Sequence, residues 1–134
     1  MLNQLAANIL TQTPLLQQRI MQQCELNDHD VMSLFTELLK YLEVNAKSSQ
    51  KRTPSIVVDD AWHEFILFTK LYAQHCHQHY GKFIHHRPGG TSQENQQQYM
   101  NTIKDIVNTF GTFNAAYWPI PCWMSLEAQC GSCD

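Results

Sequence analysis

The sequence predicts an all-α protein, a single-domain bundle of about five helices followed by an irregular C-terminal tail. Apolar residues recur at three- and four-residue steps along most of the chain, and no segment keeps the two-residue alternation of a half-buried strand. With 134 residues, 43% of them hydrophobic and 16% charged, the chain is long enough to bury a core as one domain. We expect residues 1–123 to form the helical domain and residues 124–134 to form a flexible tail.

Two short helices are expected at the N-terminus. The apolar residues between Leu2 and Leu10 form one face of the first helix. Thr13 followed by Pro14 is typical of an N-cap and a first helical residue. A second helix should therefore run from Pro14 to about Cys24.

The clearest amphipathic helix is predicted for residues 29–44, after a cap at Asn27 or Asp28. Its apolar residues recur at helical intervals and are Val31, Leu34, Phe35, Leu38, Leu39 and Leu42. Residues 45–53 are polar and basic and precede Pro54, which indicates a loop.

The fourth helix should begin at Asp59 and Asp60, because acidic residues suit the positive end of the helix dipole. Residues 56–58 would then be an apolar lead-in, and Gly81 would end the helix.

Residues 87–90 are expected to form a turn, and a fifth helix should run from Ser92 to about Gly111. The expected core combines residues from the last three helices, namely Phe35, Leu38, Tyr72, Ile103, Val107 and Phe110.

Residues 58–88 hold six of the seven histidines, which makes metal binding the first chemical hypothesis. Asp59 and His63 lie one helical turn apart on one face. Together with one or both of His85 and His86, they would suit Zn or another divalent transition metal, with an open position for water or substrate. In the alternative interpretation, His63 is a buried structural histidine that is hydrogen-bonded to Asp59.

Distance along the chain opposes the shared site if the fourth helix is continuous. His63 would lie about 27 Å from Gly81 along a straight helix, whereas His86 can reach at most roughly 17 Å from Gly81. His63 and the loop histidines can meet only if the helix breaks near Tyr72 to Cys76, or if another segment brings them back.

Helix geometry separates the other candidate ligands from this site. Cys76 falls on the apolar face, so we expect it to be a small buried packing residue. His75 and His79 form an i, i+4 pair that could chelate a metal, but their polar neighbours indicate a solvated strip.

The C-terminal tail contains a second group of candidate ligands. Cys130 and Cys133 have the C-x-x-C spacing of a zinc or redox pair, and Cys122 could supply a third thiolate. We expect a tail that can oxidise or hold a soft metal, because redox enzymes place such a pair at the start of a helix beside a strand, whereas this pair stands one residue from the end of the sequence. Deleting residues 130–134 should leave the melting temperature nearly unchanged.

One block of the sequence resembles a known family. The block comprises Trp62-His63, Tyr72, Cys76 and Tyr80-Gly81, followed by His85, His86 and Pro88. It resembles the glycine-rich-domain-containing protein family, in which a Trp-His pair precedes a Tyr, a Cys and a Gly, and in particular its bacterial single-domain members. The resemblance implies a helical domain and supplies no reaction.

Composition excludes several classes of partner. The formal net charge is -3, and the only dense basic stretch is 47–52, so we expect no nucleic acid partner. No apolar run has the length of a membrane span, so we expect no membrane partner. The N-terminus lacks the pattern of a signal peptide, and five irregularly spaced cysteines do not form a disulfide framework, which together predict a cytoplasmic protein.

Two functions remain open. The leading hypothesis is a binding or adaptor module for a protein or a small ligand, with a contact surface formed by Trp62, His63, Tyr72, His85 and His86. An exposed apolar patch at residues 118–123 would favour it. The alternative is a metal-dependent enzyme in which His63, His85 and His86 hold the ion and Asp59 or Glu64 handles protons. Sequence motifs typical of hydrolases, phosphate-binding loops and dinucleotide-binding folds are absent.

Overall fold

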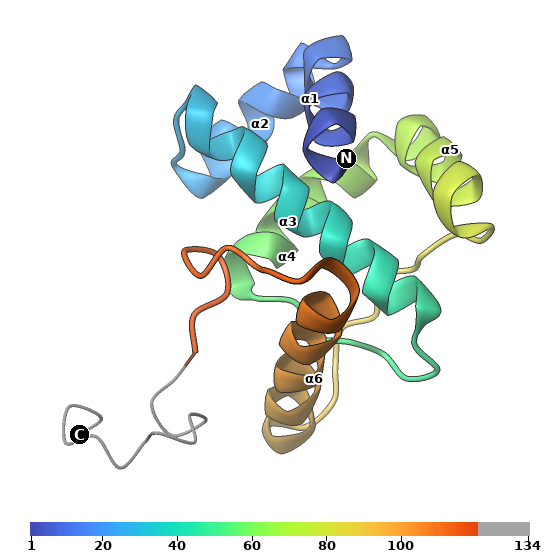
Figure 1. The fold of residues 1–134 in the computed structure, drawn as a ribbon. Coiled ribbons are helices and arrows are strands. Elements are labelled where there is room, and N and C mark those ends of the chain that lie inside the picture. The colour runs from blue at the N-terminus through green and yellow to red at the C-terminus, as the bar shows by residue number, and fades with distance from the viewer. Residues whose placement is uncertain (121–134) are drawn as a thin grey trace, which may run out of the picture.

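The computed structural model describes residues 1–120 and shows an all-α fold in that part of the chain (Figure 1). The predicted fold class is confirmed, although the helices number six within residues 1–120 and not five. They are α1 (Leu2–Gln12), α2 (Pro14–Cys24), α3 (Asp28–Lys47), α4 (Ile56–Leu67), α5 (Thr69–Tyr80) and α6 (Ser92–Phe110). The tail cysteines Cys122, Cys130 and Cys133 lie outside the described residues.

Helix α3 is the centre of the bundle. It contacts each of the other five helices, with α1 and α2 on one side and α6 on the other (Figure 1). Phe35 and Leu38, both predicted core residues, are fully buried on α3. The amphipathic pattern of residues 29–44 therefore predicted the element around which the fold is built.

Local capping signals explain several helix boundaries. Pro14 is the first residue of α2. Of the two candidate caps for α3, Asn27 is the one used, because its side chain accepts a hydrogen bond from the Asp30 N–H at 2.8 Å. Helix α6 begins with a capping box between Thr91 and Glu94 and ends at Gly111 in the left-handed conformation.

The predicted start of the fourth helix was wrong. Helix α4 begins at Ile56, three residues before Asp59, because the Ser55 side chain caps it by accepting a hydrogen bond from the Val58 N–H at 3.2 Å. Asp59 consequently lies inside the first turn and not at the cap.

The continuous helix predicted from Asp59 to Gly81 was also wrong. The chain leaves helical geometry at Phe68, with φ -88° and ψ 68°, so this residue ends α4 and precedes α5. The rings of Phe65 and Tyr72, on either side of the break, pack edge to face with centroids 5.1 Å apart. We expected any break in this helix to lie between Tyr72 and Cys76, but it lies earlier, at Phe68.

The predicted core is correct except on the last turns of α6. Tyr72 and Ile103 are buried, but Val107 is 39% exposed and Phe110 is only partly buried. Helix α6 directs Thr102, Ile103 and Ile106 inward, so Val107 falls at the edge of the buried stripe.

The segment after α6 is anchored to the bundle through a buried carboxylate. Trp118 is fully buried, and its Nε1 donates to Glu37 Oε1 at 3.1 Å. Lys40 Nζ lies 3.0 Å from the other oxygen of the Glu37 carboxylate. Trp118 therefore contributes to the core and not to an exposed apolar patch, while Trp123 lies outside the described residues.

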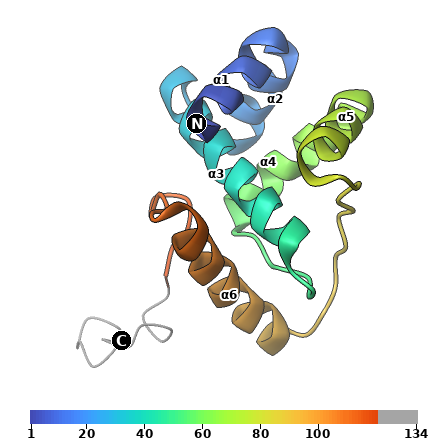
Figure 2. The ribbon, with the colours of Figure 1, turned by 45° about the vertical axis from the view of Figure 1, so that its right-hand side comes forward.

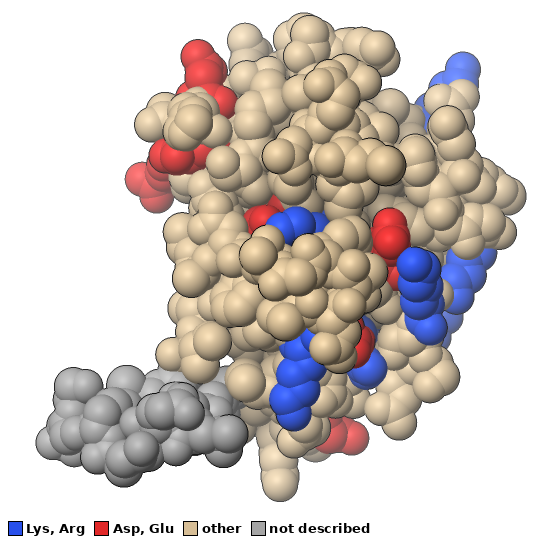
Figure 3. Space-filling model, viewed as in Figure 1, with Lys and Arg blue, Asp and Glu red and all other residues tan. Residues whose placement is uncertain are grey.

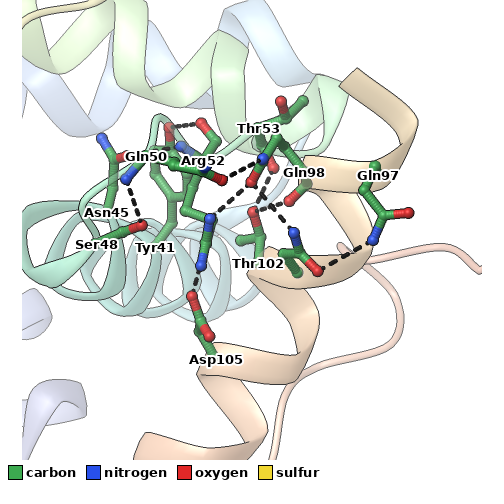
Figure 4. Close-up of polar contacts among 11 residues, drawn as sticks. Tyr41, Asn45, Ser48, Gln50, Arg52, Thr53, Gln97, Gln98, Thr102 and Asp105 are labelled. Atoms are coloured by element: carbon green, nitrogen blue, oxygen red, sulfur yellow. Dashed lines mark hydrogen bonds and ion pairs between the residues drawn. The ribbon is translucent and has the colours of Figure 1, made fainter. Parts of the chain in front are cut away.

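A polar network fixes the loop between α3 and α4 against α6 (Figure 4). Arg52 donates to Asp105 Oδ2 and to Gln98 Oε1, both at 2.7 Å. The hydroxyl of Tyr41 donates to the Arg52 carbonyl at 2.8 Å. The loop formed by residues 48–53 is thereby held next to the N-terminal half of α6.

Within residues 1–120, no helix has both the length and the apolar composition needed to cross a membrane.

Candidate metal site

Three potential metal ligands meet beside the first turns of α4. Asp59 and His63 lie one turn apart on the exposed side of this helix, and His86 comes from the segment between α5 and α6. His86 Nε2 lies 2.7 Å from Asp59 Oδ1 and 2.9 Å from His63 Nε2. His63 Nε2 lies 3.5 Å from Asp59 Oδ2. The structure therefore joins residues that a continuous helix would have kept apart.

The segment that carries His86 is an extended connection (Figure 2). Residues 83–91 have neither helical nor turn structure, so the turn predicted for residues 87–90 was wrong. Because α5 turns away at Phe68 and ends at Gly81, the connection can return along α4 before it reaches α6. Gly81 ends α5 in the left-handed conformation at φ 73°, as its sequence position predicted.

A buried pair of hydrogen bonds fixes this segment. Trp62 Nε1 donates to the hydroxyl of Tyr72 at 2.9 Å, and that hydroxyl donates to the Ile84 carbonyl at 2.6 Å. Trp62, Tyr72 and Ile84 are all buried. The Trp62 ring also packs against the His86 ring, with centroids 4.5 Å apart. These aromatic residues therefore position His86 relative to α4.

Tyr72 and Cys76, the ionisable groups on the buried face of α5 in this region, stay neutral. Burial raises the pKa of Tyr72 far above its usual value, so its hydroxyl keeps the proton that it donates to Ile84. Burial also raises the pKa of the Cys76 thiol, although hydrogen bonds with the Ile84 backbone and the Tyr72 side chain oppose the shift. Cys76 is fully buried, as its place on the apolar face predicted.

The geometry fits a small divalent cation. Ligands placed about 2.0 to 2.1 Å from a tetrahedral zinc ion lie about 3.3 Å from one another, and the observed donor spacings of 2.7, 2.9 and 3.5 Å bracket that value. His86 Nε2 either carries a proton or offers one lone pair, so it cannot both accept a hydrogen bond from His63 and donate one to Asp59. A cation between the three ligand atoms would accept one lone pair from each of them.

His85 is not part of this group. In an extended segment, successive side chains point to opposite sides, and here Ile84 is buried and His86 half-buried while Phe83 and His85 are exposed. The His85 ring packs instead on Phe83, with centroids 4.6 Å apart. The apolar Ile84, two residues before His86, was a sequence signal that could have favoured His86 over its neighbour.

Other predicted candidates lie away from the cluster. Glu64 is buried on another side of α4 and pairs with Arg19 at 2.7 Å, so it is not placed to handle protons at the site. His63 has 51% of its side chain exposed, which contradicts the interpretation that it is a buried structural histidine.

The solvated strip predicted for His75 and His79 was wrong for His75. His75 is buried because α5 turns it toward Phe65 and Tyr80, and its Nε2 lies 2.9 Å from the Tyr80 hydroxyl. Burial, and secondarily the neighbouring His79, lower the pKa of His75 to about 4. A neutral His75 therefore belongs to the packed interior.

A comparison with family models identifies the group of proteins to which the chain is related. The model described as UCP032817-like matches residues 6–111, which include Asp59, His63 and His86. The chain belongs to the UCP032817-like family. The predicted membership of the glycine-rich-domain-containing protein family was therefore wrong. The short block of aromatic and histidine residues that suggested it takes part in the packing described above. No curated protein and no solved structure matches the chain.

Of two adjoining hollows in this UCP032817-like protein, the inner one reaches two members of the three-residue cluster. The inner hollow, of about 210 Å³, is lined by Asp59 and His86 and also by Lys51, Thr53 and Arg87. The outer hollow, of about 1240 Å³, shares the last three residues and extends along α6. No sequence pattern predicted this grouping, because Lys51 and Arg87 are far apart in the chain.

Proposed function

We propose that this protein binds one divalent transition metal ion through Asp59, His63 and His86. The observation that carries the proposal is the convergence of one carboxylate and two imidazole donors whose ligand atoms all lie within 4.8 Å of one another. These donors come from two segments, and the buried contacts of Trp62 and Tyr72 hold the second segment in place.

The donor set favours zinc or ferrous iron. Zinc in catalytic sites commonly has three protein ligands, and two histidines with one carboxylate also form the ferrous site of some oxygenases. The side chains of Asp59 and His86 remain 31% and 23% exposed, so solvent can reach the remaining coordination positions. An ion held in this way would lower the pKa of a bound water or polarise a ligand oxygen.

This proposal is better supported than the binding-module hypothesis. Of the residues suggested for a contact surface, Trp62 and Tyr72 are buried, and their polar atoms are already hydrogen-bonded inside the protein. Their role is to position His86. For the compartment we propose the cytoplasm, because the two cysteines within residues 1–120, Cys24 and Cys76, are both free thiols.

Zinc titration of untagged protein tests the proposal, with His85→Ala as a matched control. Wild type should bind one equivalent of zinc. His63→Ala and His86→Ala should each weaken zinc binding by more than about tenfold, because even the loss of a residue that only contacts a metal ligand usually costs at least that much. His85→Ala removes the adjacent histidine of the same segment and should bind as wild type does. Equal losses in His85→Ala and His86→Ala, or no zinc binding by folded wild type, would contradict the proposal.

A further inference from the structure

We infer that the inner hollow is an anion subsite of the metal site, in which Lys51, Arg87 and the Thr53 hydroxyl hold the phosphate group of a small phosphorylated molecule. This inference rests on the proposed metal site and names the class of ligand that would occupy its open side. It concerns binding and assumes no particular reaction.

The first support is the distribution of unpaired positive charge. Four of the nine lysine and arginine residues form ion pairs in the described structure, namely Arg19, Lys40, Lys47 and Arg52. The other five have no ion pair within residues 1–120. Of these, Lys51, Arg87 and Lys104 line the inner or the outer hollow, and Lys82 lines a third hollow on the other side of Arg87 and His85. Figure 3 shows that most lysine and arginine side chains on the face drawn, paired or unpaired, lie in its right and lower parts.

The second support is the position of Lys51 and Arg87. They enter the inner hollow from the 48–53 loop and from the residue after His86, so the hollow has these two cations and the proposed metal ligands in its walls. The Arg52 network holds the loop in place, and the Ile84 contact holds the segment. Both cations are exposed and form no side-chain hydrogen bond in the part of the chain that the structure describes.

The third support is a polar atom that lacks a partner. Thr53 Oγ1 is buried and has no hydrogen-bond partner within residues 1–120, although Thr53 lines both hollows. Leaving a buried hydroxyl unsatisfied costs free energy, and rotation of this half-buried side chain toward a ligand oxygen in the hollow would remove that cost. Two cations, one hydroxyl and an open metal position supply four contacts, which suits a tetrahedral oxyanion better than a planar carboxylate.

The proposed metal ion favours the inner hollow for the phosphate. The formal charge of the inner hollow is +1, from Lys51, Arg87 and Asp59, and a bound divalent ion would raise it to +3. The outer hollow has a formal charge of +2, from Lys51, Arg87, Lys104 and Glu94, and none of the proposed metal ligands lines it. That larger hollow can therefore accommodate the rest of the ligand.

Metal and phosphate should consequently bind with positive coupling. Because such coupling is reciprocal, phosphate should tighten zinc binding by the same factor by which zinc tightens phosphate binding. Couplings between sites typically change affinity about 5- to 150-fold, and direct contact should place this one within that range.

The test uses inorganic phosphate as the probe and calorimetry on zinc-loaded and metal-free protein. Zinc-loaded wild type should bind phosphate with a Kd of about 1 mM or tighter. Lys51→Gln and Arg87→Gln should each weaken phosphate binding at least about fivefold, with zinc affinity measured without phosphate unchanged. Lys70→Gln removes an unpaired cation outside the hollows and should behave as wild type does.

The outcomes separate this inference from the metal proposal. Zinc binding without phosphate binding, or equal phosphate affinity in Arg87→Gln and Lys70→Gln, would overturn the anion subsite and leave the metal site intact. Acetate binding as tightly as phosphate would overturn the assignment to a tetrahedral group. Failure of the folded protein to bind zinc would overturn both.

Discussion

Replacing Tyr72 by Phe tests the contact that links the packed interior to the metal site. The change removes one hydroxyl and leaves two buried groups without a partner, the Trp62 N–H and the Ile84 carbonyl. Two lost hydrogen bonds cost about 2 kcal/mol in total, and the desolvation of the stranded groups raises the expected loss to about 2 to 4 kcal/mol. This is a large share of the 5 to 15 kcal/mol that stabilises a typical domain.

Urea denaturation of metal-free protein measures this loss, and zinc titration measures its effect on the site. Because the Ile84 contact positions the segment that carries His86, zinc affinity should fall about 10- to 100-fold. Tyr99→Phe is the matched control, since its hydroxyl donates to the Pro119 carbonyl at 2.7 Å in an exposed position. It should cost less than about 1 kcal/mol and leave zinc affinity unchanged. If the two variants behave alike, the account of how His86 is positioned is wrong.

Three further predictions concern the fold. Phe35→Ala should lower the free energy of unfolding by about 3 to 5 kcal/mol, because the side chain is fully buried. Val107→Ala, at an exposed position, should lower it by less than about 1 kcal/mol. Equal losses of the two variants in urea denaturation would contradict the assigned core. His75 has a folded pKa of about 4, below the ordinary histidine value of 6.5. The neutral side chain therefore stabilises the fold fully above pH 6.5, and this stability is lost as the pH falls toward 4. The stability difference between wild type and His75→Phe should therefore shrink by roughly 1 to 3 kcal/mol between pH 7 and pH 4, and a constant difference would refute the buried neutral histidine. Gly81→Ala should cost about 1 kcal/mol from backbone strain alone, because no atom lies within 4 Å of the added Cβ; unchanged thermal stability would argue against the left-handed conformation.

Local chemistry made several parts of the fold predictable from sequence. Pro14 fixes the start of α2 because its backbone angle suits a first helical turn. Gly81 and Gly111 end their helices because glycine adopts the left-handed conformation without a steric penalty. The α3 pattern predicted the central helix because its apolar spacing matches the helical period. Each of these signals acts within a few residues of the boundary that it sets.

The break at Phe68 was not predictable in the same way. Residues 66–70 contain neither proline nor glycine, so nothing local interrupts the helix. Tertiary contacts decide the geometry, including the packing of Phe65 on Tyr72 across the break and of α5 on α3. The distance argument against the shared site assumed a straight helix, and it failed because the bend lets the return segment run back along α4.

The proposed anion subsite could not be predicted from the sequence, for a related reason. Lys51 lies in a polar, basic segment whose composition predicts only a loop, and Arg87 follows two histidines whose pattern predicts metal binding. Only the Arg52 network with α6 brings the loop to the hollow that both residues share. Contacts between distant segments, unlike caps and periodicity, leave no local pattern.

X-ray absorption spectroscopy of zinc-loaded, untagged full-length protein tests the central claim most directly, because it identifies the atoms bound to the metal. The account predicts nitrogen and oxygen ligands at about 2.0 to 2.2 Å, with scattering from two imidazole rings in wild type and from one ring in His86→Ala. A sulfur shell at about 2.3 Å would assign the ion to cysteines such as Cys122, Cys130 and Cys133. That result, or a spectrum unchanged by His86→Ala, would contradict the site formed by Asp59, His63 and His86.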